Sequence, residues 1–208
     1  DSVNVFYYTF TGGTPTQKGL GIEKLAEYYA HYGFGEVTGI DLSGEVRGNI
    51  ANPDWKQRVK QESWLLGDTY NASIGQGGML ATPLQILNSI NAVANRGSLY
   101  KPRLYQGIRE DNGTINEEKE AEIIKSVPVS QENFTVVKEG MRQTITDGTG
   151  YQLQSLPFST AGKTGTAQTG REKNNSWFVS YGPFENPELS VIVLIEDCLL
   201  YTSDAADE

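Results

Sequence analysis

The chain has 208 residues, 38% of them hydrophobic, which is enough for one globular domain with its own core. Its net charge of −9, without any cluster of lysine or arginine, argues against a nucleic-acid-binding surface. No stretch approaches the ~20 apolar residues of a membrane-spanning helix, and one cysteine (Cys198) and one histidine (His31) cannot build a nitrogen and sulfur metal centre, so we expect no metal or other cofactor.

The first 72 residues predict two helices and a long connection. Ser2 or Asn4 could cap a short helix whose inner face would carry Val5, Phe6 and Phe10. A stronger helix is predicted from residue 21 to residue 32, because apolar residues recur there at helical spacing and glycines follow. Residues 38–42 predict a brief extended segment, and residues 43–72 an irregular surface connection.

The clearest helical pattern follows a glycine-rich turn at residues 73–78. Thr82 is placed to cap this helix, Pro83 occupies its first position and Gly97 ends it. The helix is rich in apolar residues, which predicts that it is buried in the core; they are Leu84, Leu87, Ile90, Val93 and Ala94.

The C-terminal half predicts another helix and a strand hairpin. Residues 103–110 could form a strand before a turn at 111–113, and the acidic residues 117–122 a solvated segment. Ser130 is placed to cap a helix that ends near Thr146, with Val129 packing back onto it. The predicted inner face of this helix consists of Phe134, Val137, Met141 and Ile145. Strands are predicted at residues 177–181 and 189–195, the second so apolar that we expect it at the centre of the sheet.

Between that helix and the hairpin lies the segment AGKTGTAQ, residues 161–168. Strand alternation places Lys163 and Gly165 on one face, with Thr164, Thr166 and Gln168 on the other. So little apolar bulk makes a poor core strand, and glycines allow another backbone to approach, which predicts an edge strand that holds a substrate peptide.

Two simpler interpretations of this segment were considered. A phosphate-binding loop, G-x-x-x-x-G-K-[ST], requires a glycine where this chain has Pro157, and no helical pattern follows, which excludes that loop. A plain junction between a turn and a strand stays open.

Two short motifs and several longer segments of the chain stand in a fixed order. Ser2-Val3-Asn4 resembles the S-x-N motif of penicillin-binding proteins and serine β-lactamases, and Lys163-Thr164-Gly165 resembles their K-T-G motif. With residues 64–69, 73–77, 81–85, 162–168 and 177–179, the ordered set resembles class B penicillin-binding proteins of the elongation type. It covers about residues 1–197 and implies an α/β fold of the α+β type, with a partial antiparallel sheet packed with helices.

The resemblance implies roles for both motifs. Ser2 would relay a proton to the leaving group, and Asn4 would hydrogen-bond the substrate amide. Lys163 would supply positive potential for a substrate carboxylate and hold Ser2 in place. Without the resemblance, Ser2 and Asn4 would be interpreted only as a helix cap.

The strand residues after the lysine would hold the substrate. The hydroxyls of Thr164 and Thr166 would bind its carboxylate, and the Thr166 backbone N–H would serve as an oxyanion donor. Gly165 leaves room for a peptide that adds to the strand, and Gln168 completes the substrate-binding set.

The family's nucleophile is the serine of an S-x-x-K motif, and none occurs here at the start of a predicted helix. We therefore expect the chain to be the C-terminal part of a transpeptidase domain, truncated at both ends and inactive by itself. In the family, the strand equivalent to residues 189–195 pairs with one from the N-terminal part, which implies an unpaired edge here. Residues 198–208 continue no pattern and are expected to be a non-native tail.

Three functions stay open: a peptidoglycan D,D-transpeptidase, a serine β-lactamase, and a non-catalytic sensor module of the same fold. The 43–72 connection and the context of residues 75–77 favour the first. The partners implied by the resemblance are the D-Ala-D-Ala end of a peptidoglycan stem peptide, β-lactam antibiotics and a glycosyltransferase of the elongation machinery, but no nucleic acid. The implied location is the extracytoplasmic face of the bacterial cell envelope, with a membrane anchor outside this chain.

Overall fold

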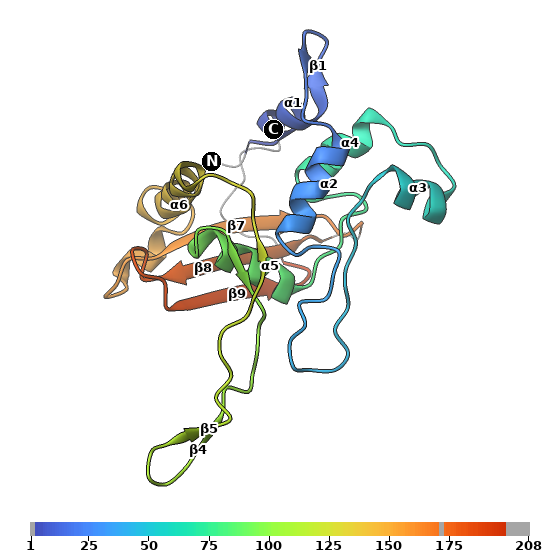
Figure 1. The fold of residues 1–208 in the computed structure, drawn as a ribbon. Coiled ribbons are helices and arrows are strands. Elements are labelled where there is room, and N and C mark those ends of the chain that lie inside the picture. Colours follow the sequence, from blue (N-terminus) through green and yellow to red (C-terminus); the bar gives the residue numbers. More distant parts are fainter. Residues whose placement is uncertain (1–2, 171–172, 199–208) are drawn as a thin grey trace.

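The computed structural model describes residues 3–170 and 173–198, which form helices packed on an antiparallel three-stranded sheet (Figure 1). The sheet has the order β7 (Ala161–Ala167), β8 (Asn175–Gly182), β9 (Leu189–Ile195). The helices are α1 (Asn4–Gly12), α2 (Ile22–His31), α3 (Pro53–Lys60), α4 (Leu66–Ser73), α5 (Pro83–Ala94) and α6 (Gln131–Thr146). Shorter elements connect them: β1 (Gly13–Thr14), β2 (Gln17–Lys18), β3 (Ser98–Tyr100), β4 (Ile108–Arg109), β5 (Ile115–Asn116), β6 (Ile123–Ser126) and the 3-10 helix η1 (Tyr151–Ser155). None of the helices in the described part of the chain combines the length and apolar character needed to span a membrane.

Helix α5 lies at the centre of the molecule and begins where the sequence predicts. The Thr82 hydroxyl accepts a hydrogen bond from the Gln85 backbone N–H at 3.1 Å, and the Gln85 side-chain oxygen accepts one from the Thr82 N–H at 2.9 Å. This capping box satisfies the exposed donors of the first turn. The Gln85 amide nitrogen also donates to the carbonyls of Glu36 and Arg47, at 2.7 and 2.9 Å. The start of α5 therefore also positions the connection that follows α2.

The C-terminal half of α5 packs on the sheet together with α6. The core cluster that joins them consists of Val93, Ala94, Met141, Ala161 and Tyr181. Ala161 of β7 lies opposite Tyr181 of β8 in the strand register, so this cluster places the first residue of β7. A second buried cluster joins α5 to β3 and to the start of α6; its members are Ala92, Leu99, Val127 and Phe134.

Helix α6 begins at the predicted cap, since the Ser130 hydroxyl accepts a hydrogen bond from the Asn133 N–H at 3.3 Å. Three residues of its predicted inner face are buried: Phe134, Met141 and Ile145. The prediction was wrong for Val137, which is 49% exposed, because Lys138 lies on the buried face instead. The Lys138 ammonium donates to the Ala94 carbonyl at 3.0 Å. A cation is favoured there because the carbonyls at a helix C-terminus carry partial negative charge.

The predicted central position of the apolar strand was wrong. Strand β9 pairs only with β8 among the described residues, and β8 is the central strand. Alternate residues of β9 face outward and are 44–68% exposed; they are Leu189, Val191, Val193 and Ile195. Apolar residues on both faces indicate burial on both faces, but in the described chain helix α5 packs against this strand on one side. The unpaired edge that the resemblance implied is present.

The expected irregular connection at 43–72 contains two short helices. Helix α3 begins after Asn52, whose side-chain oxygen accepts a hydrogen bond from the Trp55 N–H at 2.8 Å. In α4, the Asp68 carboxylate accepts hydrogen bonds from the Leu65 N–H and the Lys56 ammonium, both at 2.7 Å. These helices have eight residues each, too few for a sustained apolar period.

Helix α1 forms as predicted but with a different buried face. Val5, Phe6 and Phe10 are exposed, whereas Thr11 is buried. The reason is that α1 contacts α4 on its other side, where a Cβ on Gly12 would lie 2.2 Å from the Tyr70 ring. The cap position is Val3 and Asn4 is the first helical residue, so Asn4 is not the cap, and Ser2 lies outside the described residues. Residues 38–42 form no strand, and β3 and β6 were not predicted.

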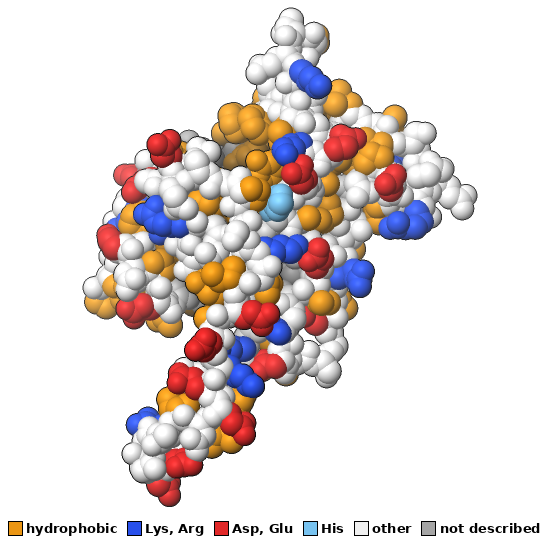
Figure 2. Space-filling view, in the orientation of Figure 1, with side chains coloured by type: hydrophobic (Ala, Val, Ile, Leu, Met, Phe, Trp, Pro, Cys, Tyr) orange, Lys and Arg blue, Asp and Glu red, His pale blue; other side chains and the backbone are white. Residues whose placement is uncertain are grey.

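Strands β4 and β5 form an arm that projects from the body of the molecule (Figure 1). The strand predicted at 103–110 forms only at Ile108–Arg109, and the expected turn follows it. Acidic side chains lie along the arm (Figure 2), and residues 117–122 are exposed as predicted. The Asp41 carboxylate fixes the base of the arm. It accepts hydrogen bonds from the N–H groups of Tyr105 and Leu104 at 2.9 and 2.7 Å, and these bonds lower the pKa of Asp41.

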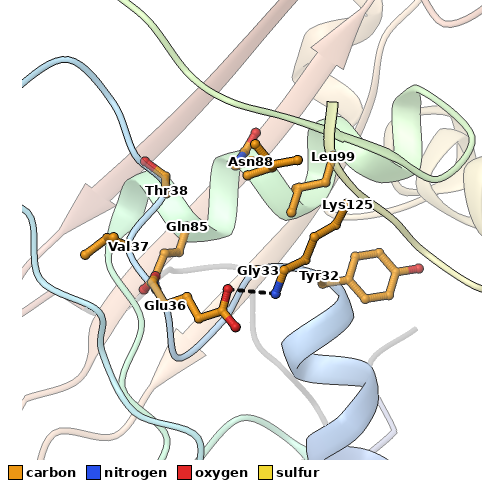
Figure 3. A pocket seen from close by; sticks show the side chains of 10 residues that line it. Tyr32, Gly33, Glu36, Val37, Thr38, Gln85, Asn88, Leu99 and Lys125 are labelled. Atoms are coloured by element: carbon orange, nitrogen blue, oxygen red, sulfur yellow. Dashed lines mark hydrogen bonds and ion pairs between the residues drawn. The ribbon is translucent and has the colours of Figure 1, made fainter. Parts of the chain in front are cut away.

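A small cavity of about 10 Å³ lies between α2, α5 and β6 (Figure 3). The Lys125 side chain lines the cavity. Its ammonium lies 2.8 Å from the Glu36 carboxylate and donates a hydrogen bond to the Ala30 carbonyl at 2.8 Å. A cavity of this size holds about one water molecule. It is therefore a feature of the packing and not a ligand site.

Two tyrosines, the half-buried Tyr29 and the buried Tyr181, provide a test of this packing. The Tyr29 hydroxyl donates to the Ala72 carbonyl at 2.9 Å, whereas the buried Tyr181 hydroxyl has no hydrogen-bond partner in the described part of the chain. Burial raises the pKa of both to about 12. We expect Tyr29→Phe to lower the free energy of unfolding by about 1 kcal/mol, and Tyr181→Phe to leave it unchanged or raise it. Urea denaturation measures both; a larger loss in Tyr181→Phe would contradict the packing described.

The outward face of β9 predicts self-association of the chain when it is expressed alone. An apolar edge strand is a template for pairing with a second molecule, and a charge on it opposes that pairing. Val191→Lys should therefore increase the monomer fraction in sedimentation velocity at a fixed concentration. The control is Val46→Lys, which adds the same charge at another exposed valine, in a connection. Equal effects of the two variants would show that net charge, and not the β9 edge, governs association.

Candidate functional site

The candidate site is built on β7, which is the edge strand that the sequence predicts. In the described residues β7 pairs with β8 alone, so its other side carries no strand. Lys163 lies opposite Val179, and Gly165 lies opposite Trp177. The K-T-G segment is thus in the middle of a regular strand and not in a loop.

Lys163 places a positive charge on this edge. Its side chain is exposed, and its ammonium donates to the Thr164 carbonyl at 2.7 Å. The lysine lies in the first half of an edge strand and outside the core clusters, so its charge lies along the strand and not in the core.

The packing of the sheet requires only one of the two glycines of β7. A Cβ on Gly162 would lie 2.7 Å from the Val179 carbonyl and 3.0 Å from the Phe178 ring, so the sheet itself requires glycine there. A Cβ on Gly165 would meet only the Trp177 Cβ, at an ordinary 3.5 Å. Packing therefore explains Gly162 but not Gly165, which leaves the space beside Gly165 open for a ligand.

Two contacts at this strand were not predicted from the sequence. The hydroxyls of Thr164 and Thr149 lie 3.2 Å apart, and Thr149 comes from the turn after α6. The Gln76 amide nitrogen donates to the Thr166 carbonyl at 3.4 Å, and Gln76 comes from the glycine-rich turn after α4. The sequence predicts only a glycine-rich turn there. Its glycines signalled a tight turn, but nothing local indicated that it lies against β7.

The free side of β7 presents the backbone groups of its threonines. Thr164 and Thr166 are two residues apart, so their carbonyls point to the same side of the strand. Both carbonyls accept hydrogen bonds from side chains, those of Lys163 and Gln76, which indicates that they face away from β8. In an extended strand the N–H of a residue points to the same side as its carbonyl, so the Thr166 N–H also faces this edge.

The remaining predicted site residues lie outside strand β7. Gln168 is exposed and follows the end of β7. Asn4 is half-exposed at the start of α1, and no hydrogen bond joins it to β7 among the described residues. Ser2 lies outside the described residues. The structure therefore brings together Lys163, Thr164, Gly165 and Thr166, with Gln168 following.

The letters S-x-x-K do occur once, at residues 98–101, but not in a helix. Ser98 begins β3, and Lys101 follows it and pairs with Glu122 at 3.4 Å. Residues three apart share a face of a helix, whereas in a strand they point to opposite faces. Ser98 and Lys101 therefore cannot form a serine–lysine pair of the helical kind.

No group of histidine, cysteine, aspartate and glutamate within residues 3–170 and 173–198 could hold a metal ion. His31 lies at the C-terminal end of α2, 3.6 Å from Glu27. It is a helix-surface residue, as the sequence predicts.

Comparisons with known proteins identify the family of this chain. The penicillin binding protein transpeptidase domain matches residues 1–208. The peptidoglycan D,D-transpeptidase MrdA of Acinetobacter baumannii is 31% identical over 197 residues, which are 86% of this chain and 29% of that protein. The chain thus spans about a third of the length of the curated relatives it matches.

Solved structures show the same fold. Penicillin-binding protein 2 of Helicobacter pylori, in its complex with MreC, is 30% identical with a TM-score of 0.76, over 93% of this chain and 34% of that chain. Penicillin-binding protein 2 of Pseudomonas aeruginosa, in complex with WCK 5153, is 29% identical with a TM-score of 0.77, over 93% of this chain and 42% of that chain. These matches confirm the predicted fold class, and the chain belongs to the penicillin-binding protein transpeptidase domain family.

Proposed function

We propose that this chain supplies the substrate-holding edge of a peptidoglycan D,D-transpeptidase. The observation that carries the proposal is the free side of β7, where outward backbone groups, two threonines and one ammonium lie on a single strand. Such an edge can pair with an extended peptide by β-addition. The names of the relatives support the reaction, since the curated proteins are D,D-transpeptidases.

The proposed reaction is acyl transfer through a serine ester. A serine oxygen attacks the carbonyl of the penultimate D-Ala of a stem peptide, the C–N bond to the terminal D-Ala breaks, and that residue leaves as an amine after taking a proton. An amine of a second stem peptide then attacks the ester, forms the cross-linking amide and releases the serine. The nucleophilic serine is not among the described residues, because their one S-x-x-K segment lies at β3.

The residues of β7 would act on the donor stem peptide, at its terminal carboxylate and at the carbonyl that is attacked. The ammonium of Lys163 attracts the terminal carboxylate of the stem peptide, which the hydroxyls of Thr164 and Thr166 would bind. The Thr166 N–H would stabilise the developing oxyanion. The open space beside Gly165 supports an approach of the peptide to this strand, and Gln168 would contact the peptide beyond the end of β7.

The S-x-N segment would transfer a proton to the leaving group and bind the substrate amide. In this proposal Ser2 relays the proton to the leaving amine, and Asn4 hydrogen-bonds the substrate. The Asn4 side chain makes no hydrogen bond to another described residue and is half-exposed, so its amide can make such a contact.

Ligands, partners and location follow from the same proposal. The ligands would be stem peptides that end in D-Ala-D-Ala, and β-lactams, which carry a reactive amide beside a carboxylate. The Helicobacter pylori relative was solved as a complex with MreC, which supports a place in a larger assembly. A glycosyltransferase of the elongation machinery is the proposed partner, and the extracytoplasmic face of the cell envelope the proposed location.

Labelling with a fluorescent penicillin tests the proposal. The protein to use is the longest reading frame that contains this chain, so that any serine outside the described residues is included. A stable fluorescent adduct is expected on a denaturing gel, and unlabelled benzylpenicillin should prevent it. Rapid hydrolysis of the β-lactam without a trapped adduct would identify a β-lactamase instead, and no reaction at all would indicate a non-catalytic module.

The variant Lys163→Ala in the same protein tests the role of β7. Loss of a charge-assisted contact to the ligand carboxylate should slow acylation by at least about tenfold. The thermal unfolding midpoint should stay the same, because the lysine is exposed. Lys18→Ala, at another exposed lysine, is the matched control. If both variants were acylated at the wild-type rate, the site would not lie on β7.

A further inference from the structure

Gln76 occupies a rigid position at the end of α4. The Gln76 N–H donates to the Asn71 carbonyl at 2.9 Å, and the Gly75 N–H donates to the Ala72 carbonyl at 3.0 Å. Together with the positive φ of +76° at Gly75, these bonds form the Schellman motif that commonly ends a helix. The backbone of Gln76 is therefore held by the helix, and only its side chain is left to move.

That side chain reaches the strand that carries the candidate site. The Gln76 amide nitrogen donates to the Thr166 carbonyl, which lies on the free side of β7, at 3.4 Å. This distance is at the long end for a hydrogen bond, so the bond is weak. Gln76 is also half-exposed, which leaves its amide room to rotate away.

Side-chain donors therefore occupy two successive outward carbonyls of β7. The Lys163 ammonium donates a hydrogen bond to the Thr164 carbonyl at 2.7 Å, and the Gln76 amide donates one to the Thr166 carbonyl. An edge strand with satisfied carbonyls is a poorer template for other strands. A peptide that adds to β7 needs these same acceptors for its own N–H groups.

We propose that the Gln76 amide is a placeholder for the peptide N–H that pairs with the Thr166 carbonyl, and that a bound ligand displaces it. The inference rests on the proposed function and adds a residue that regulates access to the edge. The placeholder competes with the amide N–H of a ligand. It therefore weakens the initial, non-covalent binding step but leaves the acylation step unchanged.

The test measures acylation of the longest reading frame by benzylpenicillin, with the dissociation constant of the initial complex separated from the acylation rate constant. Gln76→Met keeps the length of the side chain and removes the donor. We expect the dissociation constant to fall by about 2- to 3-fold, as the loss of one weak competing hydrogen bond predicts. The acylation rate constant should stay the same. Penicillanic acid, which has no acylamino N–H, should bind both proteins equally.

The controls separate this effect from a change in the fold. Gln57→Met alters an exposed glutamine of α3 and should change nothing. Gln76→Ala is a second variant, and the thermal unfolding midpoint shows whether either variant disturbs the structure. An unchanged or higher dissociation constant in both Gln76 variants would overturn the inference while wild-type labelling upholds the proposed function. If the wild type reacted with no penicillin, the proposed function would fail and the inference with it.

Discussion

The burial of α5 is the constraint on which the arrangement of the other elements depends. Its first turn uses the buried Gln85 side chain to bind the carbonyls of Glu36 and Arg47, which holds the connection after α2. Its last carbonyl, on Ala94, accepts the buried Lys138 ammonium of α6. Between these ends its apolar side chains contact the sheet. A polar group buried without such partners would cost more than its hydrogen bond contributes, so both ends specify which elements lie beside the helix.

The composition of β7 explains why this strand lies at an edge. Its glycines, threonines, alanines and lysine gain little from burial on two faces. Only its first residue, Ala161, belongs to the core, and Gly162 must be glycine because Val179 and Phe178 lie against it. From Lys163 onward the strand is less constrained by packing. The core therefore anchors the strand at one end, and the side chains of the candidate site follow where no neighbour needs their volume.

Helices with a local start signal could be predicted with near-exact boundaries. Thr82-Pro83 and Ser130 each place a side-chain oxygen within three residues of the backbone N–H that it accepts, so the signal lies within one helical turn. The same kind of signal at Asn52-Pro53 was missed in the connection at 43–72, because the helix that follows is short and polar. The buried position of Lys138 could not be predicted, since the carbonyl that it binds lies 44 residues away.

For the candidate site, the sequence by itself determined the strand that carries Lys163, Thr164, Gly165 and Thr166, because alternation and the lack of apolar bulk are local properties. Family membership also followed from motifs in their order. Only the tertiary structure decided that Gln76 binds the Thr166 carbonyl, that Thr149 contacts Thr164, and that the apolar β9 lies at the opposite edge. The Gln76 contact joins residues 90 apart, and strand order depends on which elements pack against each other. Neither is encoded in the period or composition of a single segment, because both arise only when helices and strands bury their surfaces together.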